Sequence, residues 1–306
     1  MPDELRTWIF EQDDTEVVDH SVSLNYDYFT ANEVRLQCFC KDKVLTRILP
    51  QGMEIPSAFE QVGHLIHLNL RSELLPYKYV IGQVLLDKIP TCKTVVNKVG
   101  KIDTVFRTFG MEVLAGEDNT VVTLKEENCI FEFDYRKVYW NSRLQHEHAR
   151  LVSTFDRSDV IADMFCGIGP FVLPAAKKGC MVYGNDLNPF CYEYLNKNLK
   201  LNKVSDVPGS KLKLEKNVKT YNLDAREFIT QIIGENIPIT QIVMNLPVSA
   251  ELFCDVFRTC FSVSMSSPFY LEFHTSSPFS ALLHVQRIRR PHQGFYHGTI
   301  ASSASL

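Results

Sequence analysis

Short apolar runs alternate with amphipathic segments most regularly between residues 144 and 257. Residues 160–165 have the pattern of a buried strand, which ends in an acid and is followed by a glycine-bearing turn. Further strands are expected at 181–186, 218–223 and 241–244, and helices at 170–178, 189–201 and 225–233. Such short-spaced alternation predicts an α/β fold with a doubly wound parallel sheet.

The segments on either side have different patterns. Residues 23–143 mix apolar runs with strand-like stretches at 105–113 and 129–139, and Asp118-Asn119 is a turn candidate, which together predict a smaller α+β domain. Residues 1–22 are acidic and aperiodic, which indicates a tail. Residues 258–306 are rich in serine, carry Glu272 as their single acid, and predict an atypical, poorly folded tail.

Composition narrows the class of protein. Apolar residues make up 45% and charged residues 22% of the 306 residues, as in ordinary globular proteins. No apolar run reaches the roughly 20 residues of a membrane helix, so no membrane contact is expected. The nine cysteines form no CxxC pairs, which predicts reduced thiols and no metal site. The acidic start is unlike a transit peptide, so a cytoplasmic or nuclear location is expected.

The net charge does not exclude a nucleic-acid partner. The net charge of −4 argues against a uniformly basic binder, but the acidic N-terminus dominates that sum. Residues 88–101 carry four lysines with no acid between them. Such a cluster either tracks phosphates or forms a solvated rim, and the sequence leaves both open.

Three acids follow consecutive predicted strands: Asp163, Asp186 and Asp224. Ligands of open parallel sheets bind beyond the carboxyl ends of the strands, where Gly167 and Gly169 let the backbone approach closely. The turn lacks the third glycine of a dinucleotide site and carries Pro170, which disfavours a nicotinamide dehydrogenase. A nucleoside cofactor without pyrophosphate fits better, and S-adenosylmethionine is the predicted one. Helix capping is the alternative for each acid.

The last predicted strand of this block ends in Asn245-Leu246-Pro247. An amide followed by a rigid proline beside the cofactor is suited to holding the edge of a flipped nucleobase. A plain turn is the alternative.

Several stretches together resemble the archaeal and eukaryotic tRNA (guanine-37-N1) methyltransferases, from about residue 25 to residue 257. They are DMFCGIGPF (163–171), NDLNP (185–189), NLP (245–247), FEQVGHLIHLNL (59–70), PYKYVIGQVLLDK (76–88), FRTFGMEVLAGE (106–117) and VYWNSRL (138–144). The resemblance implies a Rossmann-like class I methyltransferase domain over 144–257, behind an RNA-binding or linker domain over 23–143.

The resemblance also implies site residues. Glu147 matches the general base that removes the N1 proton, and Arg107 matches the arginine that stabilises O6. The residues implied to hold the target base are Tyr139, Asn245 and Pro247. Those implied to bind S-adenosylmethionine are Asp163, Phe165, Gly167, Gly169, Asp186, Leu187, Asp224 and Asn245. The implied partner is the anticodon loop of a tRNA with guanosine 37, bound by a monomer.

Two departures from the family pattern keep alternatives open. Only an acidic segment of about 22 residues precedes the matched region, where the family has a small domain. The two strands expected after Pro247 are predicted to be missing. A truncated isoform that binds cofactor or tRNA without catalysis is therefore one alternative. The aminocarboxypropyl transferase of wybutosine synthesis, which uses the same cofactor, is another. The family also commonly works in mitochondria.

Overall fold

The computed structural model describes residues 41–56, 59–100, 106–204, 217–246, 249–257, 270–277 and 280–288. The chain divides into two compact units, residues 1–57 and 58–306. The described part of the first unit contains helix α2 (Lys41–Ile48), which buries Val44 and Leu45. The predicted tail over 1–22 lies outside the described residues.

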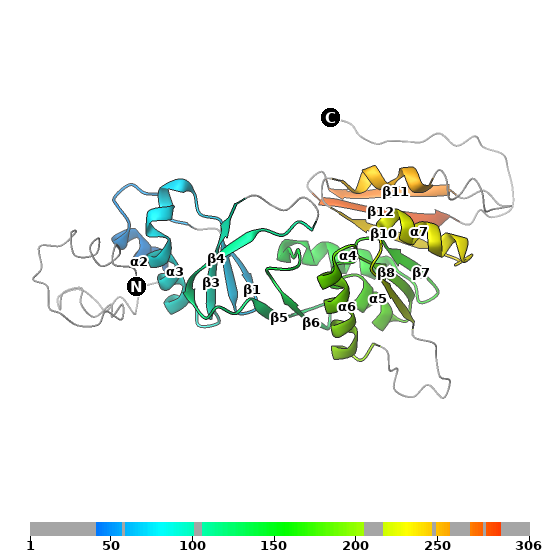
Figure 1. The fold of residues 1–306 in the computed structure, drawn as a ribbon, viewed down its shortest axis with the longest axis horizontal. Helices are drawn as coiled ribbons and strands as arrows, with labels where there is room; N and C mark the ends of the chain where they lie inside the picture. The colour runs from blue at the N-terminus through cyan, green and yellow to red at the C-terminus, as the bar shows by residue number, and fades with distance from the viewer. Residues whose placement is uncertain are drawn as a thin grey trace, which may run out of the picture. The chain divides into compact units, whose positions relative to one another are not determined.

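A four-stranded sheet opens the second unit (Figure 1). Its strands, in spatial order, are β1 (Glu60–Val62), β2 (Leu65–Leu68), β3 (Thr94–Val99) and β4 (Gly110–Gly116). Strands β2 and β3 run parallel, and the other pairs are antiparallel. Between β2 and β3 the chain forms η3 (Ser72–Tyr77) and helix α3 (Lys78–Lys88). This arrangement confirms the predicted small α+β region.

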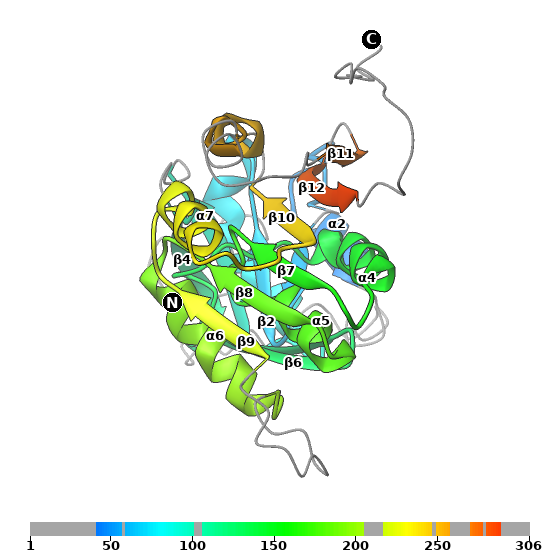
Figure 2. The ribbon, with the colours of Figure 1, turned by 90° about the vertical axis from the view of Figure 1, so that its right-hand side faces the viewer.

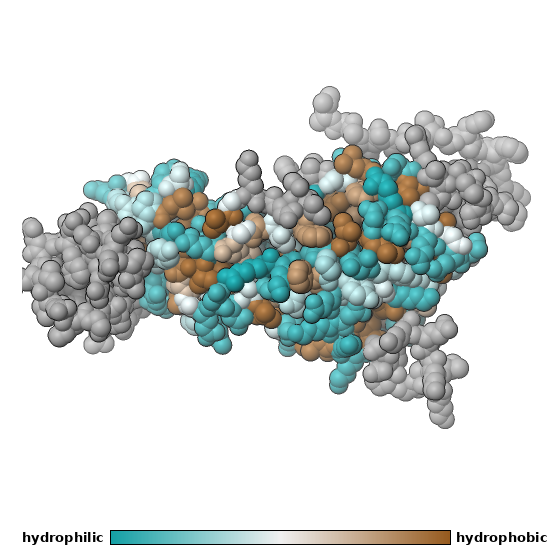
Figure 3. All heavy atoms as spheres, in the orientation of Figure 1, coloured by the Kyte–Doolittle hydropathy of each residue, from teal (hydrophilic) through white to brown (hydrophobic). Residues whose placement is uncertain are grey.

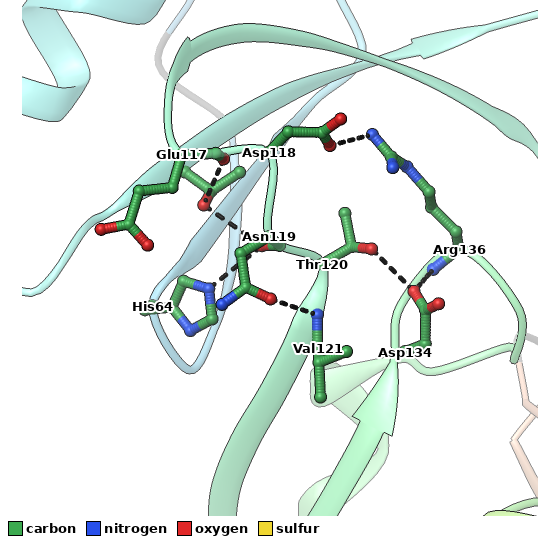
Figure 4. A network of polar contacts seen from close by, with 9 residues as sticks. His64, Glu117, Asp118, Asn119, Thr120, Val121, Asp134 and Arg136 are labelled. Carbon is green, nitrogen blue, oxygen red and sulfur yellow. Dashed lines mark hydrogen bonds and ion pairs between the residues drawn. The ribbon is translucent and has the colours of Figure 1, made fainter.

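Polar contacts fix the predicted turn at Asp118-Asn119 (Figure 4). The Asn119 side chain accepts a hydrogen bond from the Val121 amide at 3.1 Å, and the Asn119 carbonyl accepts one from the Thr94 hydroxyl at 3.2 Å. Arg136 pairs with Asp118 at 2.7 Å. The turn leads from β4 into the hairpin of β5 (Val121–Glu126) and β6 (Cys129–Asp134).

A second sheet contains the predicted parallel strands. Strands β7 (Val160–Asp163), β8 (Met181–Asn185), β9 (Val218–Tyr221) and β10 (Gln241–Asn245) lie in the order β10-β7-β8-β9. They alternate with helices α5 (Val172–Lys178), α6 (Pro189–Leu201) and α7 (Ala225–Gly234), and α4 (Gln145–Thr154) precedes β7. Because the chain crosses from β9 to β10 on the far side of β7, the strand order switches between β7 and β10.

Alternate side chains of this sheet enter two separate cores. Ile161, Val182 and Val243 pack into one core with α4, α5 and α6. The intervening residues, such as Ala162 and Tyr183, pack with α7 into the other core. Helix α7 is seen on one side of the sheet and α5 on the other in Figure 2. Burial of both faces is the mark of a doubly wound sheet, and the predicted fold class is confirmed.

The expected loss of the sheet's C-terminal edge is wrong. Strands β11 (Tyr270–Ser277) and β12 (Ser280–Ile288) form an antiparallel pair, and β12 runs antiparallel to β10 from Gln241 to Asn245. These strands were not predicted because their short apolar alternation lies in a serine-rich part of the sequence. The unpaired backbone edge of β10 favours strand addition, because its amides and carbonyls otherwise lack partners.

Candidate functional site

A cavity opens at the carboxyl ends of β7, β8 and β10, where the strand order switches. Its walls combine apolar and polar side chains with the backbone of the glycine turn. The lining residues are Phe106, Arg107, Tyr139, Trp140, Asn141, Leu144, His148, Phe165, Cys166, Gly167, Ile168, Pro170, Asp186, Leu187, Asn188, Cys191, Asn245, Leu246 and Phe253. Seven predicted site residues therefore meet in one place: Arg107, Tyr139, Phe165, Gly167, Asp186, Leu187 and Asn245.

The turn after β7 requires both of its glycines. Gly167 and Gly169 have φ angles of 53° and 101°, a region that side-chain-bearing residues rarely adopt. A Cβ on Gly169 would lie 2.3 Å from Leu173 Cδ1, so this glycine lets the turn pack on α5. A Cβ on Gly167 would meet no atom within 4 Å, so the cavity beside it is open to a ligand.

Asp186 joins the turn to the end of β8. Its carboxylate accepts hydrogen bonds from the Gly167 amide at 2.8 Å and the Asn188 amide at 2.9 Å. Burial raises the pKa of this carboxyl group, although the two amides oppose the rise. The Cys191 side chain also hydrogen-bonds this carboxylate, and a lone pair remains for a further donor, such as a ribose hydroxyl. Leu187, which is 48% exposed, adds an apolar surface beside it.

Asp163 lies behind the turn with no exposed surface. Its Oδ1 accepts a hydrogen bond from the Phe165 amide at 3.3 Å, while its Oδ2 is buried without a partner. Burial holds the pKa of the Asp163 carboxyl well above its usual range. Asp163 is not among the residues that line the cavity, so its role there is to hold the turn from behind. The residues that line the cavity, with Asp186 beside the Gly167 turn and Leu187, thus fit a cofactor with a nucleoside part.

Three segments of the chain bring predicted catalytic groups to this cavity. Arg107 lies in the loop before β4 with a φ of 57°, and its Nη2 donates a hydrogen bond to the Ser249 hydroxyl at 2.8 Å. Asn245 ends β10, and Tyr139, which is 37% exposed, follows β6. A guanidinium, a phenol and an amide beside a nucleoside-sized pocket make a polar rim for a second planar ligand.

Other predicted residues lie elsewhere. Glu147 is in the first turn of α4, where its carboxylate accepts hydrogen bonds from Arg150 at 2.6 and 2.8 Å. Its helix neighbours Leu144 and His148 line the cavity, but Glu147 does not. Asp224 caps α7 by accepting a hydrogen bond from the Arg226 amide at 2.8 Å, as the capping alternative describes. Pro247 lies outside the described residues.

One buried pair at the cavity is not indicated by any sequence pattern. His148 Nδ1 lies 2.5 Å from Glu126 Oε1, and both residues are buried. His148 Nε2 and the neighbouring Trp140 Nε1 are buried without hydrogen-bond partners. Since 22 residues separate His148 from Glu126 in different elements, no local pattern predicts their contact.

One face of the molecule carries both hydrophobic and hydrophilic side chains (Figure 3). Hydrophobic patches interrupt hydrophilic side chains on the face of the molecule drawn in Figure 3. Within the described residues, no group of three His, Cys, Asp or Glu side chains is placed to hold a metal ion. None of the described helices is long and apolar enough to cross a membrane.

Two family models match consecutive parts of the chain. Residues 42–120 match the TYW2 N-terminal domain, and residues 121–264 match the TRM5/TYW2 methyltransferase domain. The junction falls just before the β5–β6 hairpin. The domain boundary placed at residue 143 stays a prediction.

Curated relatives named tRNA (guanine(37)-N(1))-methyltransferase match most of the chain. The Dictyostelium discoideum protein is 49% identical over 262 residues, covering 85% of this chain and 52% of its own. The Phytophthora infestans protein is 50% identical over 240 residues, covering 78% and 54%. The Xenopus tropicalis protein is 42% identical over 277 residues, covering 86% and 52%. The chain thus spans about half the length of these relatives.

Solved structures share the fold. A complex of aTrm5 with tRNALeu aligns at 25% identity with a TM-score of 0.54, over 81% of this chain and 75% of that chain. Trm5b from Pyrococcus abyssi aligns at 24% identity with a TM-score of 0.54, over 76% and 74%. TYW2 from P. horikoshii, in complex with MeSAdo, aligns at 22% identity with a TM-score of 0.54, over 81% and 96%.

Proposed function

The chain belongs to the TRM5/TYW2 methyltransferase family through residues 121–264, and from this premise we propose that it transfers a methyl group from S-adenosylmethionine to N1 of guanosine 37 in tRNA. One observation supports this most directly. Arg107 and Asn245 lie on the same cavity as Asp186 and the Gly167 turn. A group that stabilises an oxyanion therefore faces the place where a nucleoside cofactor fits.

The proposed cofactor residues have complementary tasks. Asp186 accepts the ribose hydroxyls, while Gly167 leaves room beside them. Phe165 and Leu187 give the adenine an apolar surface, and buried Asp163 holds the turn behind them by accepting a hydrogen bond from the Phe165 amide. When bound, S-adenosylmethionine supplies an electrophilic methyl group.

The proposed target-base residues remove the N1 proton of guanine and stabilise the negative charge that develops on O6. Guanine N1 carries a proton, so its methylation requires a base, and negative charge grows on O6 as that proton leaves. Arg107 stabilises that charge, and Asn245 hydrogen-bonds the edge of the base. Glu147 is the proposed base, on the helix turn between the cavity residues Leu144 and His148. In this proposal its carboxylate exchanges the Arg150 contact for the base when tRNA binds.

The test is transfer of label from S-adenosylmethionine to an unmodified tRNA transcript with guanosine 37, mapped by mass spectrometry. We expect N1-methylguanosine at position 37. Glu147→Gln should lower the single-turnover rate by about 10²-fold to 10⁴-fold, as loss of a general base does. Arg107→Ala should lower it by about 10²-fold or more. Matched control Glu193→Ala, on exposed α6 surface, should keep the wild-type rate. No methylated guanosine with the wild-type chain would refute the proposal.

A second candidate is transfer of the aminocarboxypropyl arm of the same cofactor. The match of residues 42–120 to the TYW2 N-terminal domain favours it. The mass of the modified nucleoside distinguishes the two reactions in the same assay.

We also propose that the protein works as a monomer in the cytoplasm and nucleus. Imaging of the tagged protein in its own cells tests it, and confinement to mitochondria would refute it.

A further inference from the structure

Ser249 contacts a predicted catalytic residue although no sequence pattern singled it out. It precedes η5 (Ala250–Phe253) at the N-cap position, where a serine hydroxyl commonly accepts a hydrogen bond from a backbone amide. Here the side chain makes no capping hydrogen bond. Its hydroxyl instead accepts a hydrogen bond from Arg107 Nη2 at 2.8 Å.

Arg107 needs such a constraint more than most arginines do. Its φ of 57° is a left-handed conformation, which costs a residue with a side chain about 1 kcal/mol. Its guanidinium is carried on a long, flexible side chain, so a fixed position for the charge depends on contacts near the tip. Ser249 supplies one of these contacts from 142 residues further along the chain.

Ser249 is itself fixed relative to the base-binding strand. Its amide donates a hydrogen bond to the Leu246 carbonyl at 3.3 Å, and the Ala250 amide donates one to the same carbonyl at 3.1 Å. Leu246 directly follows Asn245, and both line the cavity with Arg107. The hydrogen bond to Ser249 therefore ties the Arg107 charge to the backbone that directly follows Asn245.

We propose that Ser249 is a positioning residue, which holds the Arg107 guanidinium where negative charge grows on the target base. This inference rests on the proposed function for its role in transfer. A hydrogen bond from a charged group to a neutral acceptor orients a side chain strongly, and small misplacement of a catalytic group slows transfer markedly. Ser249 acts through Arg107 and does not itself contact the reacting atoms.

Single-turnover transfer at saturating cofactor and tRNA tests the role. Ser249→Ala should lower the rate by about 10-fold to 100-fold, and Ser249→Thr, which keeps a hydroxyl, should restore most of it. In an Arg107→Ala background, Ser249→Ala should cause no further loss. The control Ser153→Ala, on the exposed face of α4, should leave the rate unchanged. A wild-type rate for Ser249→Ala, or losses that multiply in the double variant, would overturn the proposal.

A second readout does not depend on activity. In protein labelled with ¹⁵N-arginine, the Arg107 side-chain signal is identified by its loss in Arg107→Lys. We expect Ser249→Ala to speed rotation of this guanidinium about its Nε–Cζ bond, while affinity for S-adenosylhomocysteine stays unchanged. Equal rotation in the two proteins would overturn the positioning role. If the wild-type chain transfers no group at all, the proposed function fails, and this measurement still decides whether Ser249 holds Arg107.

Discussion

At the scale of single residues, burial makes the charge of Asp163 unfavourable. Its pKa in the folded protein lies well above the usual 3.8, mainly because burial disfavours the carboxylate. The folded state therefore binds more protons than the unfolded state between these two pKa values. Stability from this group is complete below the unfolded pKa and is lost as pH rises through the folded pKa.

Replacing Asp163 with Asn should remove that loss. Without cofactor, we expect the Asp163→Asn protein to have a higher melting temperature than the wild type at neutral pH. The difference in melting temperature should disappear as pH falls toward 4. The substitution removes a pH dependence of the free energy of unfolding of at most about 1.4 kcal/mol per pH unit. Thermal melts across this range measure it. The matched control is Asp224→Asn, which keeps a capping side chain on an exposed position of α7. A difference in melting temperature that grows on acidification would contradict burial of the Asp163 carboxylate as its cause.

The residue scale also shows where the sequence was informative about the site. Asp186 and the Gly167 turn were predictable because strand ends and glycines are local features that the parallel fold brings together. The contacts of Arg107 with Ser249 and of His148 with Glu126 were not predictable. Each joins side chains from separate elements, so only the packed structure places them side by side.

At the scale of elements, helix α6 satisfies the backbone edge of strand β6. The Asn202 side chain accepts a hydrogen bond from the Ile130 amide at 2.8 Å and donates one to the Ile130 carbonyl at 2.6 Å. Asn198 accepts one from the Glu132 amide at 2.9 Å. These amides take the place of a neighbouring strand and join the β5–β6 hairpin to the cofactor-binding half.

Asn202→Ala should therefore lower the free energy of unfolding. Two backbone groups of Ile130 lose their partner, at a cost of about 1 to 3 kcal/mol. Denaturant titration measures the change, and Glu193→Ala on the exposed face of α6 should change it by no more than about 0.5 kcal/mol. Equal stabilities for the two variants would show that water replaces the amide without cost.

Prediction of the elements from the sequence succeeded where patterns were local and long. Helix α6 spans Pro189–Leu201, the range that its apolar period and Pro189 indicate. Strand β4 runs over Gly110–Gly116, later than the 105–113 expected, because pairing with β3 sets its ends. Strand β12 was missed because its partner, β10, decides its conformation more than its own serine-rich surroundings do.

At the scale of the whole sheet, the β11–β12 pair covers the edge next to the target-base residue. Strand β12 pairs with all of Gln241–Asn245, and Asn245 at the end of that strand lines the cavity. Strand β10 pairs with β7 through its other edge. Alternate amides of β10 therefore depend on β12 for their hydrogen bonds.

A chain shortened to end at Phe257 should expose that edge. By hydrogen exchange, we expect the β10 amides that face β12 to exchange faster than in the full chain, while those that face β7 change less. An open, apolar strand edge also favours association, so the shortened protein should aggregate more on concentration. A chain that ends at Ile288 is the matched control, because it keeps every residue that pairs with β10. Equal exchange in the two shortened chains would show that β10 is protected without β12.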